Sequence, residues 1–272
     1  MILPSFAFEV EPLGASPLFN VGPLTITNTM LTGVLVAIVL ISILVRAARK
    51  SQLNPKAKLS FYVESVVELV LGLIVELFGD REKAMRYFPL LLSLFLFILA
   101  CNLTGILPGI ESITYFHNGT HTSLLRAWTT DLNATAALAV LTMAVVEVHA
   151  IREIGFKGYF QHYFTHQPWK PMNLFVGLLD VFGEFMRLVT LALRLFGVIY
   201  GGEALLFAIA AVTGNFGWAG MLPIFFLEIF FCFVQAYLFM MLSASYLVMS
   251  TSMHEQEAEH SGAVAQLSKA SS

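Results

Sequence analysis

The stretch TLALRLFGVIYGGE, residues Thr190 to Glu203, places an arginine, Arg194, and a glutamate, Glu203, inside an apolar run that extends from Asn173 to Val212. An ionisable side chain at the centre of a bilayer costs about 3 kcal/mol even on insertion scales, so such a residue indicates a functional site. Arg194 and Glu203 are nine positions apart, which on a helix is about two and a half turns and about 14 Å along the axis. The two side chains are therefore predicted to point to opposite faces and not to form an ion pair with each other.

Composition places the chain in a membrane. Hydrophobic residues make up 57% of its 272 residues and charged residues only 12%, against roughly 25% charged residues in soluble domains. The apolar residues gather in runs of roughly 20, the length of a helix that crosses a bilayer. We therefore predict an all-α integral membrane protein, and the net charge of -3 gives no indication of a nucleic-acid partner.

Five membrane spans are predicted, which together with their connections form a membrane domain over residues 24–252: about 24–45, 88–107, 131–151, 173–212 and 221–250. The leader, residues 1–23, has no Lys or Arg, whereas basic residues follow the first span at once. The positive-inside rule then predicts an external N-terminus and a cytoplasmic tail, residues 253–272. The fourth run would reach about 60 Å as a straight helix, twice the thickness of the bilayer core. The last two spans are thus predicted to form a long, tilted helical hairpin.

Three further segments are predicted to lie on the cytoplasmic side. Residues 56–86 are apolar but carry basic residues at both ends, so an interfacial helix or hairpin is expected there. Pro168 and Pro171 predict a linker without continuous helix over residues 152–171. The polar tail beyond Ser250 is expected to be loose and to carry no chemistry.

The last hairpin contains further polar residues besides Arg194 and Glu203. Glu228 and Gln235 are seven positions apart, so they share one stripe of the closing helix. An arginine keeps its charge at any accessible pH, and a fixed cation with separated carboxylates and an amide is what an ion path requires. A static network of buried ion pairs that holds the helices together is the alternative.

Metal and cofactor sites are not expected. His117 and His121 are four positions apart, as metal ligands on a helix can be, but Asn118-Gly119 between them predicts a turn. Cys101 and Cys232 lie in apolar segments without a CxxC pattern. Both cysteines are predicted to be free and buried.

The stretch LALRLFGVIYGGE resembles the signature of subunit a of the F-type ATP synthase, which is near S-L-x-L-R-L-x-G-N-x-x-A-G-E. Further similar stretches follow in the same order along nearly the whole chain: NLTGILPG, TTDLNATAALA and FVQAYLFMMLSASYLVMS. The resemblance implies a membrane stator subunit, without a catalytic site of its own, that provides two ion half-channels and couples proton flow to rotation of the c-ring for ATP synthesis. It also implies the c-ring, subunit b of the peripheral stalk and the remaining ATP synthase subunits as partners, and a bacterial inner membrane as the location. H⁺ is the expected ion, with Na⁺ as the alternative.

Carried over position by position, the resemblance implies that Arg194 is the stator arginine that faces the rotor ring. Glu203 and Glu228 would line the half-channel that opens outside, and Gln235 would lie near Arg194 and orient it.

The same comparison of positions implies supporting roles for residues around this set. Thr190 stands where the family usually has serine and keeps its hydroxyl, whereas Val198 replaces the usual asparagine and leaves the role of that position in doubt. Asp131, which is expected to cap the third span, and Glu111 resemble residues that line the outer entrance.

Two other classes of membrane protein predict different patterns. A secondary transporter would be expected to contain repeats of inverted topology, and an intramembrane enzyme would need a nucleophile with its base or an HExxH motif. The sequence contains neither pattern.

Overall fold

The computed structural model describes residues 16–21, 24–50, 58–107, 110, 113–117, 120–163, 171–213 and 217–270. Within these ranges the chain forms the helices α1 (Asn28–Lys50), α2 (Lys58–Phe78), α3 (Arg81–Ile106), α4 (Leu132–Tyr163), α5 (Pro171–Thr213) and α6 (Gly217–Ala270). Two antiparallel hairpins, β1–β2 (Pro17–Val21, Leu24–Thr27) and β3–β4 (Thr114–His117, Thr120–Ser123), and a 3₁₀ turn, η1 (Trp128–Thr130), complete these elements. The all-α membrane fold predicted from the sequence is confirmed.

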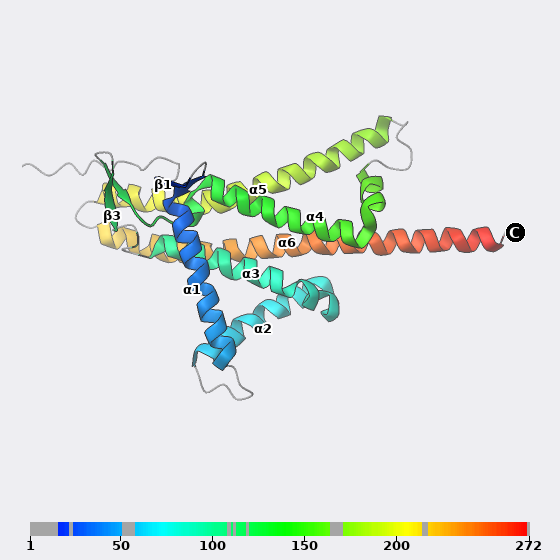
Figure 1. The fold of residues 1–272 in the computed structure, drawn as a ribbon, viewed down its shortest axis with the longest axis horizontal. Coiled ribbons are helices and arrows are strands. Elements are labelled where there is room, and N and C mark those ends of the chain that lie inside the picture. The colour runs from blue at the N-terminus through cyan, green and yellow to red at the C-terminus, as the bar shows by residue number, and fades with distance from the viewer. Residues whose placement is uncertain are drawn as a thin grey trace, which may run out of the picture.

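Five of the helices in the described residues are long and apolar enough to cross a membrane, which confirms the number of predicted spans: Asn28–Arg49, Arg81–Ile106, Leu132–His149, Gly177–Leu206 and Gly220–Val248. Helix α2, which carries three glutamates, is not among them. Helices α3, α4, α5 and α6 run along one long axis, and α1 crosses them near the two hairpins (Figure 1).

The core of the bundle lies where α6 packs against α3, α4 and α5. Its largest buried side chains include Phe239 and Met240 of α6, Leu91 and Ile98 of α3 and Leu195 of α5. A smaller buried cluster nearer the hairpins joins Ile106, Ile199 and Cys232. Because each of these three residues belongs to a different helix, the smaller cluster fixes how α3, α5 and α6 are aligned along their axes.

Helix α1 packs against α3, α2 and η1. The Gly33 backbone lies so close to the indole of Trp128 that a Cβ atom at this position would overlap the ring. The Asn28 amide donates to the Ser123 carbonyl at 3.1 Å and accepts from the Ser16 backbone N–H at 3.1 Å. These contacts hold the start of α1 beside the segment that leads into α4.

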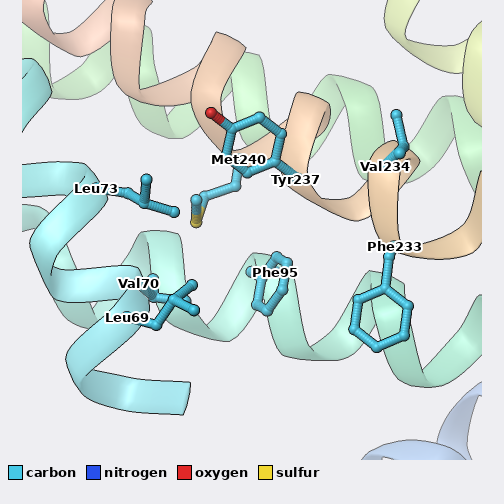
Figure 2. Close-up of a pocket in the computed structure, with 8 residues that line it drawn as sticks. All are labelled: Leu69, Val70, Leu73, Phe95, Phe233, Val234, Tyr237 and Met240. Atoms are coloured by element: carbon cyan, nitrogen blue, oxygen red, sulfur yellow. The ribbon is translucent and has the colours of Figure 1, made fainter. Parts of the chain in front are cut away.

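Helix α2 leaves a hollow of about 230 Å³ between itself and α6, above α3. Its walls are apolar (Figure 2): Leu69, Val70, Leu73, Phe95, Phe233, Val234, Tyr237 and Met240. Val70, at the edge of this hollow, and Ile74 are fully buried and anchor α2 in the core.

The predicted boundaries differ from the observed ones in two places near the N-terminal half. Residues 24–27, predicted as the start of the first span, form β2. Helix α1 begins only at Asn28, because the Thr27 hydroxyl caps it by accepting from the Met30 backbone N–H at 3.3 Å. The segment 56–86 is divided at Gly79, whose φ of +67° ends α2. The Asp80 side chain then accepts from the Glu82 backbone N–H at 2.9 Å, so residues 81–86 belong to the spanning helix α3.

Two segments expected to be irregular contain helix within the described residues. Helix α4 continues to Tyr163 across a kink at Gly155, where φ is +81°, because Pro168 and Pro171 come only after that point. The tail expected to be loose continues α6 to Ala270. The Glu, Gln, Ala and Lys residues of this tail are strong helix formers, which explains why the polar composition does not end the helix.

Candidate functional site

Helix α5 carries Arg194 at the border between its buried and exposed faces. Leu195 and Ile199, on one side of Arg194, are almost fully buried in the bundle, whereas Leu193 on the other side is 52% exposed. Arg194 itself is half-buried. Among the described residues, no hydrogen bond or ion pair engages its guanidinium group.

A stripe of small residues runs along α5 on the same side as Arg194. Thr190, Gly197 and Gly201 are four positions before, three after and seven after the arginine, so they share its face of the helix. A Cβ atom at either glycine would meet nothing within 4 Å, and the Thr190 hydroxyl is satisfied by the Met186 carbonyl at 2.7 Å. Small side chains therefore leave open space on this face of α5 around Arg194, which is the charged residue of these four.

Helix α6 places Glu228 directly against the backbone of α5. Glu228 is 6% exposed, and a Cβ atom at Gly202 would lie 2.6 Å from its Oε1 and 3.1 Å from its Cδ. The carboxyl group thus occupies the space that any other residue at position 202 would fill with its side chain. Its Oε2 has no hydrogen-bond partner among the described residues.

A cavity of about 220 Å³ lies between α5 and α6 next to this carboxyl group. Glu228 is the only charged residue that lines it; the other lining residues are Val198, Gly201, Gly202, Leu205, Ile224, Leu227 and Phe231. Val198, which stands where the resembling family has asparagine, therefore forms part of an apolar wall. Glu203 is not among the lining residues, although it is half-buried and follows Gly202 directly.

The contact between Gly202 and Glu228 also fixes which residues of the two helices lie at the same level. Helices α5 and α6 run in opposite directions (Figure 1). Arg194 is eight residues before Gly202 on α5, so it lies level with the residue eight positions after Glu228 on α6, which is Ala236. Gln235, next to this position, is 3% exposed, and its Nε2 has no hydrogen-bond partner among the described residues. Arg194 and Gln235 are therefore close to the same depth, and Glu203 and Glu228 share a level about 12 Å away along the helices.

Asp131 occupies a different part of the molecule. Its Oδ1 accepts from the Asn133 backbone N–H at 2.9 Å, which confirms the predicted cap of α4, and its Oδ2 accepts from the Thr29 hydroxyl at 3.1 Å. The side chain is 5% exposed and joins α1 to α4. Glu111 lies outside the described residues.

We expect Asp131→Ala to lower the stability of the protein by about 2 kcal/mol, because it removes both the helix cap and the bond to Thr29. Thr29→Val is the matched variant, since it keeps the helix cap and removes the bond to Asp131 together with the bond between the Thr29 and Thr27 hydroxyls at 3.0 Å. It should cost about half as much. Thermal denaturation of the assembled complex measures both. Stability at the parental level in Asp131→Ala would contradict this structural role.

Two features of the site were not anticipated from the sequence. Gly202 has a specific role only because α6 brings Glu228 against it. Asn102 is completely buried in α3, and neither atom of its amide group has a hydrogen-bond partner among the described residues. Its signal in the sequence was a lone amide within a run of about 20 apolar residues.

Comparison with known proteins places the chain among subunits of one complex. The model of the family described as ATP synthase A chain matches residues 29–248. ATP synthase subunit a of Moorella thermoacetica is 31% identical over 85% of this chain and 93% of its own length. ATP synthase subunit a 1 of Hahella chejuensis is 32% identical over 84% and 85%, and ATP synthase subunit a of Geotalea daltonii is 31% identical over 91% and 94%.

Proposed function

Because this chain belongs to the ATP synthase A chain family, we propose that four polar residues on α5 and α6 carry its proton path: Arg194, Glu203, Glu228 and Gln235. Members of this family are multi-pass subunits of the membrane sector that supply the proton channel for ATP synthesis, and catalysis is carried by other subunits. The observation that carries the residue assignment is the carboxyl group of Glu228. It is buried against bare backbone, keeps one oxygen without a partner and borders a cavity between two membrane helices.

Each of the four residues has a distinct task in this proposal. Protons enter from outside past Glu203 and Glu228 and protonate a carboxylate of the rotor. After almost a full turn of the rotor they leave on the cytoplasmic side. Arg194 separates the two routes, because its permanent positive charge repels protons and attracts the deprotonated rotor carboxylate. Gln235, at nearly the same depth, orients the arginine.

The rotor ring of c subunits is the proposed partner of the α5 face that carries Arg194. The open positions at Gly197 and Gly201 support this contact, because small residues allow another helix to approach closely within a membrane. Subunit b of the peripheral stalk and the remaining ATP synthase subunits are proposed to contact other surfaces. We propose that Thr190 keeps a polar group on the rotor-facing stripe and that Asp131 and Glu111 contribute to the outer entrance.

We further propose a bacterial inner membrane as the location, with the N-terminus outside and the C-terminus in the cytoplasm. The basic residues after the first span support this orientation: Arg46, Arg49, Lys50, Lys56 and Lys58. The named relatives are bacterial proteins. The proposed ion is H⁺, and Na⁺ remains the alternative that an ion-substitution experiment would separate.

Glu228→Gln should lower ATP-driven proton uptake about tenfold in vesicles that contain the assembled complex, because an amide cannot release and rebind a proton. Glu203→Gln should lower it as well. Quenching of a pH-sensitive dye in the vesicles measures the uptake, and subunit content of the purified complex serves as the control for assembly. If both variants assemble and pump like the parent, these carboxyl groups are structural and the proposed path is wrong.

A further inference from the structure

Two buried amide side chains in the bundle lack the hydrogen bonds that such groups normally form. Asn102 of α3 is completely buried with both polar atoms unpartnered among the described residues. Gln235 of α6 is 3% exposed, with its Nε2 unpartnered. An unsatisfied buried polar group destabilises a protein, so nearly all buried polar atoms in proteins bind another group or an ordered water.

The alignment of α3 and α6 brings these two residues to the same depth. The helices are neighbours that run in opposite directions (Figure 1), and Ile106 and Cys232 meet in one buried cluster. Asn102 is four residues, about 6 Å along the axis, from Ile106, and Gln235 is three residues, about 4.5 Å, from Cys232. Both amides lie on the side of this cluster that points away from the hairpins. The difference in depth is about 1.5 Å.

The two amides also belong to the faces on which α3 and α6 meet. Ile98 and Ile106, one turn on either side of Asn102, are buried in the bundle, as are Cys232 and Ala236 on either side of Gln235. Ile98 and Ala236 belong to the large core cluster, and Ile106 and Cys232 belong to the small one. The amides thus form a polar layer between two apolar clusters.

We propose that Asn102 is a positioning residue for Gln235. The Gln235 Nε2 donates to one buried water that in turn donates to the Asn102 Oδ1, because neither of these atoms bonds directly to a described residue. This bridge fixes the Gln235 side chain at the depth of Arg194. The inference rests on the proposed function of Gln235 and Arg194, and it adds α3 to the two helices that form the site.

A structural role and a positioning role for Asn102 predict opposite effects on stability. Leucine is branched at the same atom as asparagine and has no polar atoms, although it is larger. Asn102→Leu therefore removes two unsatisfied groups at the cost of some overpacking, and the stability of the complex should change little. Proton pumping should nevertheless fall, because Gln235 loses the bond that holds it. We expect about a tenfold lower rate of ATP-driven uptake with an unchanged denaturation temperature.

A double-mutant cycle on assembled complexes in vesicles tests the coupling between the two amides. The variants are Asn102→Leu, Gln235→Leu and the combination of both, with pumping rate and denaturation temperature as readouts. If Asn102 acts through Gln235, the combined variant pumps no more slowly than Gln235→Leu alone. Thr104→Val is the matched control on α3, because the Thr104 hydroxyl donates to the Cys101 carbonyl of its own helix at 2.6 Å. This control should pump like the parent.

Several results would overturn the inference. Parental pumping in Asn102→Leu would do so, as would effects of the two substitutions that multiply in the combined variant. If Asn102→Leu fails to assemble, an experimental density map of the parent complex decides: a direct bond or one shared water between the amides supports the inference, and Gln235 Nε2 bonded to another group contradicts it. Failure of the proposed function gives a different result, in which Gln235→Leu alone already pumps like the parent.

Discussion

Replacing Arg194 by alanine should abolish ATP-driven proton uptake, with a fall of at least about 100-fold, because it removes the permanent positive charge that separates the two proton routes. The guanidinium group has no hydrogen bond or ion pair among the described residues, so its removal leaves no buried partner without a counter-charge. Assembly of the complex is therefore expected to survive. Arg194→Lys should also pump poorly, because the ammonium group is a more strongly hydrated point charge without the planar fork of arginine.

Proton uptake by reconstituted vesicles, with ATP hydrolysis measured in parallel, tests this expectation. One elementary charge that crosses 100 mV corresponds to about 2.3 kcal/mol, so a path without a barrier would dissipate the driving force. We expect hydrolysis by the variant to be uncoupled from uptake. Normal uptake by an assembled Arg194→Ala complex would show that this arginine does not separate two routes.

Replacing Gly202 by valine should lower pumping by about 10- to 100-fold, because the new side chain would overlap a carboxyl group on α6 and displace it. That group is the carboxyl of Glu228, whose Oε1 would lie 2.6 Å from the new Cβ. A displaced carboxyl group would no longer border the cavity in the same position. Gly202→Ala should have a smaller effect in the same direction, because its Cβ alone forces the carboxyl to shift.

Gly183→Val on the same helix provides the matched control. A Cβ atom there would meet nothing within 4 Å, so the control changes helix propensity equally without touching the site. Pumping rate and complex assembly measured for both variants separate the local displacement from a general effect on α5. Equal effects at positions 183 and 202 would contradict the contact with Glu228.

The charged residues of the site could be predicted from the sequence because charge in an apolar run is conspicuous. Arg194 and Glu203 stand out in this way, and the number of spans follows from the length of apolar runs. The cap at Asp131 was also predictable, since its side chain precedes the helix that it caps. Signals of this kind are local, so a single segment contains all the information they need.

Contacts between helices could not be predicted, because they depend on how separate segments align. The contact between Glu228 and Gly202 can be predicted only if the register of α5 against α6 is known. The depth of Asn102 relative to Gln235 depends in the same way on the register of α3 against α6. The boundary at Gly79 had a local signal, an aspartate that caps the next helix. It was missed because basic residues on both sides of residues 56–86 predicted an interfacial helix or hairpin over the whole segment.

The passive proton conductance of vesicles that contain the Arg194→Ala complex, with and without Glu228→Gln, tests the account most directly. If Arg194 separates two half-channels and Glu228 lies in one of them, the single variant leaks protons without ATP. The added substitution then closes the leak, because the outer route has lost its carrier group. A leak of equal size in both complexes would place Glu228 off the ion path and contradict the account.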